Sequence, residues 1–259
     1  MNLDLTGKTA LVCGSTAGIG KAIAKELAEM GASLILMARN EEKLKATVAE
    51  MSAGENQDHA YLVADFSDVE SVKKAVASLK KPVNILINNT GGPPGGPIAD
   101  AKLEEFSAAF QMHLLCNHAL VQGIKQGMID SGYGRIVNII STSVKIPLNG
   151  LGVSNTIRGA VANWSKTMAN ELGVYGITVN NVLPGATATE RLSAIIENKA
   201  SKTGKSKAEI EKQFQDAVPL KRVAQPEEVA AAAAFLASPA ASYINGINVP
   251  VDGGRTGSL

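Results

Sequence analysis

Seven apolar runs of six or seven residues alternate with longer amphipathic patterns along almost the whole chain. The runs are apolar at odd and even positions alike, which is typical of strands in a parallel sheet that helices cover on both faces. We predict strands at 9–14, 33–38, 59–64, 83–89, 135–141, 177–183 and 246–252, and helices at 19–30, 41–51, 68–79, 103–130, 152–173 and 226–237. No linker-like stretch divides the 259 residues. The pattern predicts α/β architecture: a single doubly wound, Rossmann-type domain over residues 1–259.

Charge and cysteine content exclude several classes of partner. Twenty-five basic residues oppose twenty-four acidic ones, a balance without the positive surface that nucleic acid or an anionic membrane attracts. No apolar run approaches the roughly 18 residues of a membrane span. Two cysteines, Cys13 and Cys116, neither form a disulfide framework nor show metal-ligand spacing. We therefore expect a cytoplasmic protein with no metal site and no nucleic-acid or membrane partner.

A glycine cluster follows the first predicted strand. Gly14, Gly18 and Gly20 lie in the sequence CGSTAGIG (13–20), at the turn into the first predicted helix. Backbone amides at such a turn face an anion, and glycine lets the chain approach a pyrophosphate closely. The cluster predicts a dinucleotide site, although its spacing is Gly-x-x-x-Gly-x-Gly.

Four further motifs follow in order: LINNTGG (86–92), GRIVNIIS (134–141), NNVLPGATATE (180–190) and YINGINVPVDGG (243–254). With the glycine cluster they resemble the classical short-chain dehydrogenase/reductase family, in its 3-oxoacyl-carrier-protein-reductase-like branch. The resemblance implies an oxidoreductase that interconverts a ketone and a secondary alcohol, with a small carbonyl or alcohol substrate. It also implies a homo-oligomer, usually a tetramer.

The second predicted strand ends in LILMARNEEK, which bears on the choice of cofactor. Ala38 stands where family members that use NAD tend to have aspartate, and Arg39 follows it. A guanidinium suits the additional phosphate of NADP, and no carboxylate at position 38 repels it. We expect NADP(H) to be preferred over NAD(H). The alternative is that Arg39 is a solvated loop charge or a residue at the entry to the next helix.

The resemblance implies other contacts to the cofactor. Asp65 and Phe66 flank the adenine, Asn88 and Gly91 line the channel, and Thr187 meets the carboxamide through its backbone. The full set of expected cofactor-binding residues is Gly14, Ser15, Thr16, Gly18, Ile19, Gly20, Arg39, Asp65, Phe66, Asn88, Gly91, Arg158, Pro184, Gly185, Thr187 and Thr189.

The catalytic positions depart from the family pattern, which has an asparagine, a serine, and a tyrosine and lysine four residues apart. Ser141 keeps the serine, but His113 stands at the asparagine, Ser154 at the tyrosine and Arg158 at the lysine. Asn117 lies one turn from His113, so a shifted alignment is an alternative.

These replacements leave the proton donor unassigned. A serine hydroxyl is a weaker acid than a phenol and reaches less far, whereas Arg158 keeps a positive charge but does not release a proton. An imidazole titrates near neutrality. We therefore hypothesise a proton relay from His113 through water, with Ser154 as relay partner and Ser141 orienting the carbonyl. His118 is a weaker alternative.

Two other questions stay open at this stage. The lysine-rich segment 190–222 follows the sixth predicted strand and is interpreted as a substrate lid, the alternative being a solvated helical hairpin. Loss of the tyrosine leaves a second function class, a catalytically silent cofactor-binding sensor or partner subunit. An intermediate possibility is a narrow substrate whose own acidic group, such as a carboxylate held by Arg158, replaces the missing function.

Overall fold

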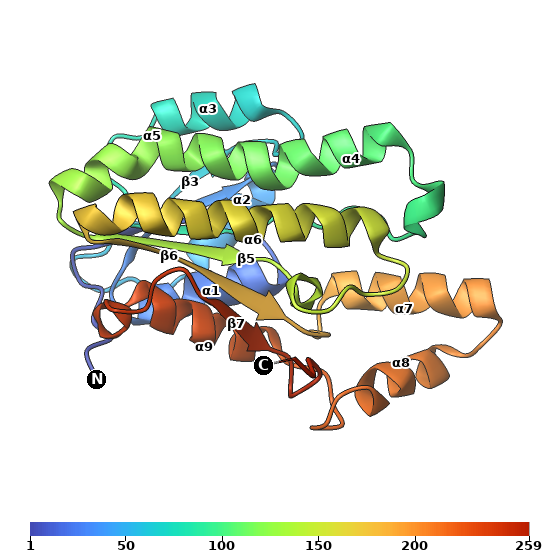
Figure 1. The fold of residues 1–259 in the computed structure, drawn as a ribbon. Helices are drawn as coiled ribbons and strands as arrows, with labels where there is room; N and C mark the ends of the chain where they lie inside the picture. The colour runs from blue at the N-terminus through green and yellow to red at the C-terminus, as the bar shows by residue number, and fades with distance from the viewer. Residues whose placement is uncertain (259) are drawn as a thin grey trace.

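The computed structural model describes residues 1–258 and contains a seven-stranded parallel sheet in the order β3-β2-β1-β4-β5-β6-β7 (Figure 1). The strands are β1 Thr9–Cys13, β2 Ser33–Ala38, β3 Ala60–Val63, β4 Ile85–Asn88, β5 Gly134–Ile139, β6 Ile177–Pro184 and β7 Asn248–Val251. Their ends lie within two residues of the predicted ends. The predicted doubly wound fold is confirmed. Strand order reverses between β1 and β4, and ligands bind outside the carboxyl ends of the strands at such a point.

Helices cover both faces of the sheet because its strands bury alternate side chains on opposite sides. Ala10 and Val12 of β1 pack in one core with α1 (Gly18–Glu29), α2 (Glu41–Ala49) and α9 (Pro226–Ala237). Leu11 and Cys13 pack in the other with α3 (Val69–Ala77), α5 (Cys116–Asp130) and α6 (Gly152–Leu172). Figure 1 shows α1 and α9 below the sheet and α3, α5 and α6 above it. Short turns η1 (Ile98–Asp100), η3 (Thr142–Val144), η4 (Gly173–Tyr175) and η5 (Pro239–Ala241) complete the connections.

The helix predicted over 103–130 is interrupted. It forms α4 (Leu103–Phe110), a π-helical turn η2 (Gln111–Leu115) and then α5. A π turn inserts one extra residue into the helical repeat and redirects the side chains within it. His113 lies in this turn and is buried.

Beyond β6 the chain forms two helices that project past the carboxyl edge of the sheet (Figure 1). They are α7 (Glu190–Thr203) and α8 (Lys207–Asp216). Thr189 caps α7 by accepting from the Leu192 amide, and Leu192, Ile196 and Ile210 form a small core between the helices. The segment 190–222 is thus a hairpin with its own apolar contacts, attached beside the carboxyl ends of the strands.

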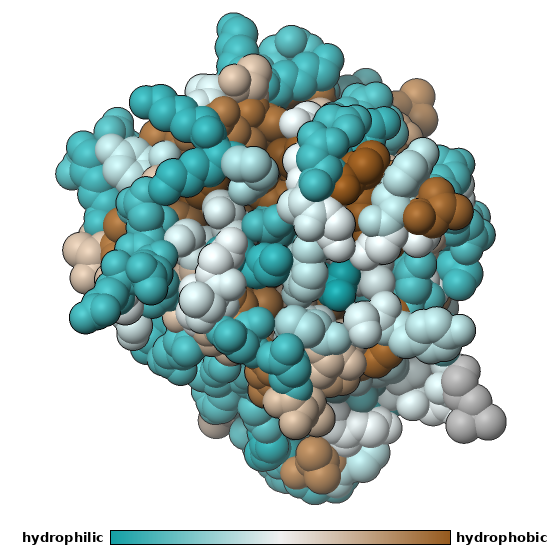
Figure 2. All heavy atoms as spheres, turned by 90° about the vertical axis from the view of Figure 1, so that its left-hand side faces the viewer, coloured by the Kyte–Doolittle hydropathy of each residue, from teal (hydrophilic) through white to brown (hydrophobic). Residues whose placement is uncertain are grey.

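Figure 2 shows the end of the molecule at the amino ends of the strands, where polar side chains dominate and apolar ones are scattered among them. Within residues 1–258 we find no helix with the length and apolarity that crossing a membrane requires. Cys13 and Cys116 are buried and unpaired.

Candidate active site

The glycine loop connects β1 to α1 through a very close backbone approach. Gly14 has a φ of +57°, a conformation that glycine adopts without steric cost. A Cβ on Gly20 would lie 2.2 Å from the Gly14 carbonyl oxygen. The side-chain amide of Asn89 donates to the carbonyls of Cys13 and Gly14, each at 3.2 Å. The loop is therefore fixed between the first helix and the end of β4.

Two neighbouring cavities follow the carboxyl ends of the strands and share Thr90 and Gly92 at their border. The larger, of about 790 Å³, is lined by the predicted residues Gly14, Thr16, Arg39, Asp65, Phe66, Gly91 and His113. The smaller, of about 230 Å³, is lined by the predicted residues Ile19, Ser141, Ser154, Arg158, Pro184, Gly185, Thr187 and Thr189. The predicted residues Ser15, Gly18, Gly20 and Asn88 line neither cavity. Together the cavities form one groove across the switch point of the sheet.

Asn88, although predicted to line the cofactor channel, is buried in a ladder of side-chain amides. Its Nδ2 donates to Asn138 at 2.7 Å, Asn138 donates to Asn181 at 2.9 Å, and Asn181 donates to Asn248 at 2.8 Å. The four residues lie opposite one another on β4 to β7. The ladder holds the strand ends beneath the groove in register.

Positive charge gathers at one end of the larger cavity. Arg39 and Lys43 both line it, and no carboxylate within residues 1–258 forms an ion pair with either. Asp65 lies on the same wall; hydrogen bonds from Ser67 lower the pKa of its carboxyl, with Arg39 adding a smaller effect. Sequence reasoning missed Lys43, whose place one turn into α2 from Arg39 is the signal that would have identified it.

The smaller cavity brings together Ser141, Ser154 and Arg158. Ser141 ends the β5 segment and caps η3, where its Oγ accepts from the Ser143 amide at 3.1 Å. Ser154 and Arg158 lie one turn apart on the same face of α6, and each is only 8% exposed. Arg158 donates from Nη1 to the Ile139 carbonyl at 3.3 Å. Burial, and then the neighbouring charge of Arg191, lower the pKa of Arg158 to about 10.

His113 does not titrate near neutrality as expected. Its ring is 2% exposed, Nδ1 shares a hydrogen bond of 2.8 Å with the Thr90 hydroxyl, and Nε2 has no partner within residues 1–258. Burial, followed by the charges of Arg158 and Arg191, lowers the pKa of His113 to about 2. The imidazole is therefore neutral at physiological pH, which removes the basis for treating it as a charged acid.

None of the four tyrosines lines either cavity. The Tyr133 hydroxyl donates to the Ala237 carbonyl at 2.7 Å and that of Tyr61 to Glu41 at 3.0 Å, while Tyr175 and Tyr243 are exposed. His118 accepts from the Trp164 indole at 3.3 Å. No phenol therefore lines the groove in place of the missing tyrosine.

Two arginines at this site were missed. Arg191, in the first turn of α7, donates to the carbonyls of Gly92 at 2.8 Å and Pro93 at 3.2 Å. Arg255, after β7, lines the same cavity as Arg158. They lie on segments far apart in sequence, so no spacing pattern connects them to Arg158. The contacts of Arg191 join the α7–α8 hairpin to the loop after β4.

The environment of His113 predicts how stability depends on pH. Above pH 6.5 the ring is neutral in both the folded and unfolded protein, whereas below it the unfolded chain binds a proton that the folded protein excludes. The free energy of unfolding is therefore expected to fall as pH drops below 6.5, by up to about 1.4 kcal/mol per pH unit from this residue. Urea unfolding between pH 4 and pH 7 should show that the free energy of unfolding of His113→Asn changes less with pH than that of the wild type. His118→Asn is the control, and an equal slope in all three proteins would contradict the assignment.

Residues 14–256 match a family model described as enoyl-(acyl carrier protein) reductase. The chain is 32% identical to the NADPH-dependent reductase BacG of Bacillus subtilis, over 98% of this chain and 100% of that one. It is 34% identical to the 3-oxoacyl-(acyl-carrier-protein) reductase FabG of Vibrio cholerae, over 97% and 98%. The crystal structure of L-sorbose reductase from Gluconobacter frateurii, complexed with NADPH and L-sorbose, superposes with a TM-score of 0.93 at 29% identity and covers both chains completely. Because sequence, fold and glycine loop agree over nearly its whole length, the chain belongs to the classical short-chain dehydrogenase/reductase family.

Proposed function

We propose that this protein is an NADP(H)-dependent oxidoreductase that interconverts a ketone and a secondary alcohol. The observation that carries the proposal is the continuous groove, which has a glycine cradle and two unpaired cations at one end and Ser141, Ser154 and Arg158 at the other. BacG and L-sorbose reductase, by their descriptions, depend on or bind NADPH, which supports the same cofactor here.

The residues of the groove fit this cofactor. Gly14 and Gly20 have no room for a Cβ against their protein neighbours, so the loop keeps the tight turn that lets a pyrophosphate approach the amides at the start of α1. Asp65 and Phe66 lie at the adenine end of the larger cavity, with Arg39 and Lys43 available for a 2′-phosphate. Pro184, Gly185, Thr187 and Thr189 form the wall beside Ser141. The bound cofactor supplies hydride.

The chain's own groups act on the other reactant. The hydroxyl of Ser141 orients the carbonyl, and Arg158, whose donors are largely unspent, stabilises the negative charge that develops on its oxygen. Ser154 lies one turn away and passes a proton from water to that oxygen. His113 acts as a neutral link in this route, since one ring nitrogen already shares a hydrogen bond with Thr90. No charged imidazolium is required.

The alternative is a catalytically silent cofactor-binding protein, a sensor or partner subunit. It is favoured by the absence of any phenol among the lining residues of the groove. Oxidation of NADPH measured against ketones, keto acids, keto sugars and 3-oxoacyl thioesters separates the two. Turnover supports the oxidoreductase, whereas tight NADPH binding without turnover in either direction supports the silent role.

Cofactor preference is tested at the adenosine end. Arg39→Ala is expected to raise the Kd for NADPH by about 10- to 100-fold, because one charge-assisted contact to a phosphate is lost, while the Kd for NADH changes less than about threefold. Lys45→Ala is the control, since Lys45 is also in α2 but lies outside the cavity lining and pairs with Glu41 at 3.2 Å and Glu42 at 3.0 Å. Fluorescence titration measures both constants. Equal effects on NADPH and NADH would remove the support for NADP(H).

The proposal also covers the role of the α7–α8 hairpin, the oligomeric state and the cellular compartment. The segment 190–222 acts as a lid, and the contacts from Arg191 to the loop after β4 support this. A homotetramer in the cytoplasm is supported by two observations: Leu103, Val174 and Tyr243 are highly exposed, and both cysteines are reduced and buried.

A further inference from the structure

Three arginines from distant parts of the chain line the cavity that contains Ser141 and Ser154. Arg158 comes from α6, Arg191 from the start of α7 and Arg255 from the segment after β7. The lining includes no aspartate and no glutamate. Within residues 1–258 none of the three forms an ion pair. The cavity therefore gathers positive charge without a protein counter-ion.

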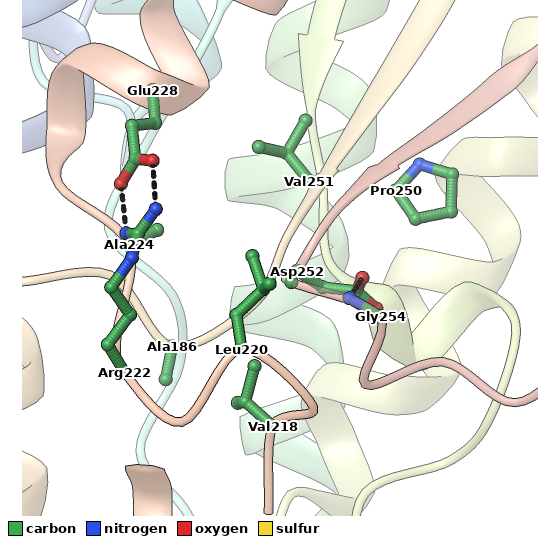
Figure 3. A pocket seen from close by; sticks show the side chains of 11 residues that line it. Ala186, Val218, Leu220, Arg222, Ala224, Glu228, Pro250, Val251, Asp252 and Gly254 are labelled. Carbon is green, nitrogen blue, oxygen red and sulfur yellow. Dashed lines mark hydrogen bonds and ion pairs between the residues drawn. The ribbon is translucent and has the colours of Figure 1, made fainter.

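Two other arginines show how this chain usually satisfies a guanidinium. Arg222 makes two parallel contacts of 2.6 Å with Glu228, as Figure 3 shows. This pair lines another cavity, whose volume is about 350 Å³. Arg135, which is 4% exposed, donates to three backbone carbonyls and lies 4.2 Å from the centre of the Tyr133 ring. Both make several contacts with protein groups.

Arg158 is buried almost as deeply but has far fewer partners. Among the residues that the structure describes, 1–258, it makes one hydrogen bond, to the Ile139 carbonyl at 3.3 Å, which uses one of five N–H donors. Arg191 adds a like charge close enough to lower the pKa of Arg158 further than burial alone does. A buried, unpaired cation beside a second cation is unfavourable until an anion compensates them. The planar fork of a guanidinium matches a carboxylate with two parallel hydrogen bonds.

Another part of the cavity lining consists of large apolar side chains. Leu148 and Leu151 line it from the segment before α6, and Ile195 and Phe214 line it from α7 and α8. A polyol offers nothing to these side chains, whereas an aliphatic or aromatic group buries apolar surface against them. The cavity thus combines a cationic wall with an apolar wall.

We propose that Arg158, Arg191 and Arg255 bind a carboxylate of the substrate, which is an oxo acid with an apolar body, or the corresponding hydroxy acid. This assignment rests on the proposed function and names its substrate class. In the reductive direction the carbonyl carbon would accept a hydride, which NADPH supplies, and the carbonyl oxygen would accept a proton taken up from solvent through water, which gives the hydroxy acid and NADP⁺. The carboxylate is unchanged.

Another occupant for these charges is the pyrophosphate of the cofactor. The glycine loop at the start of α1 already provides amides for that group, and Arg158 lies beside Ser141 and Ser154. The proposal therefore predicts that changes at Arg191 and Arg255 weaken carboxylate binding and largely spare cofactor binding.

Binding is tested without turnover by calorimetry on the full-length protein saturated with NADP⁺, with phenyllactate as the probe. Arg191→Leu and Arg255→Leu are each expected to raise the Kd for phenyllactate at least tenfold and to change the Kd for NADP⁺ less than threefold. Lys202→Leu, on α7 outside the cavity lining, is the control and is expected to change neither. Equal weakening of NADP⁺ and phenyllactate overturns the proposal, as does tighter binding of phenyl phosphate than of phenyllactate.

Turnover separates this inference from the proposed function. With NADPH, phenylpyruvate is expected to have a kcat/KM at least 100-fold above that of phenylacetone, which has a methyl group in place of the carboxylate. Faster turnover of phenylacetone overturns the carboxylate assignment and leaves the oxidoreductase in place. Binding of phenyllactate that depends on Arg191 and Arg255, without turnover of any substrate, supports the carboxylate site and contradicts the oxidoreductase.

Discussion

Replacing Arg158 with methionine is expected to make the ligand-free protein more stable by about 1 to 3 kcal/mol and to lower kcat/KM by about 100- to 1000-fold. Methionine is unbranched and flexible, so it fills much of the space of the arginine stem. The substitution removes a positive charge that burial and the like charge of Arg191 make unfavourable. The loss of one hydrogen bond of 3.3 Å to the Ile139 carbonyl offsets part of the gain. The rate falls because the developing oxyanion loses its charged donor.

The matched control is Arg135→Met, a second buried arginine that is changed in the same way. Because Arg135 donates to three carbonyls and contacts the Tyr133 ring, its removal leaves buried acceptors unpaired and is expected to destabilise the protein by about 2 to 4 kcal/mol. Urea unfolding of both variants without ligand gives the comparison. A loss of stability in Arg158→Met as large as that in Arg135→Met would mean that Arg158 has a structural role.

The stability changes expected for Arg158→Met and Arg135→Met have opposite signs because the two arginines have different surroundings. Arg135 is matched by the protein that surrounds it, whereas Arg158 is held ready for a partner that arrives with the reactants. A group kept in a costly state before binding lowers the stability of the free protein but requires no rearrangement when charge develops. In this interpretation the replacement of the family's lysine by arginine gains a bidentate anion-binding group.

The fold was predictable because its local patterns and its tertiary structure agree. Strands such as Leu34–Met37 are apolar on both faces, and only a sheet covered on both sides buries both faces. The convergence of Ser154 and Arg158 was predictable as well, since a spacing of four residues places two side chains on one helical face.

Other features arise only from tertiary packing. The π turn that buries His113 breaks no propensity rule in the sequence QMHLL, and the ring's low pKa comes from burial and two arginines distant in sequence. Arg191 reaches the cavity because the α7–α8 hairpin folds back toward the loop after β4. The sequence therefore contains no signal for the charge state of His113. It also contains no signal that three arginines would line one cavity.

The close backbone approach in the glycine loop predicts the second large effect, at Gly20. A Cβ there would lie 2.2 Å from the Gly14 carbonyl oxygen and 2.6 Å from Nδ2 of Asn89. The first atom belongs to the turn that joins β1 to α1, and the second belongs to the side chain after β4 that donates to this turn, so the turn itself has to move. Gly20→Ala is expected to destabilise the protein by about 3 kcal/mol or more and to raise the Kd for NADPH at least about 100-fold, because the amides that face the pyrophosphate are displaced with it.

Gly159→Ala is the control, because it makes the same change inside a helix where a Cβ meets nothing within 4 Å. Alanine is the better helix former, so this variant is expected to gain up to about 1 kcal/mol. Thermal unfolding with and without NADPH measures both quantities for each variant. If Gly20→Ala retained wild-type stability and NADPH binding, the glycine would not be required for close approach and the cofactor would have to bind elsewhere in the groove. Loss of stability with NADPH binding intact would instead mean that Gly20 is required for the packing of α1 on β1 but not for recognition of the pyrophosphate.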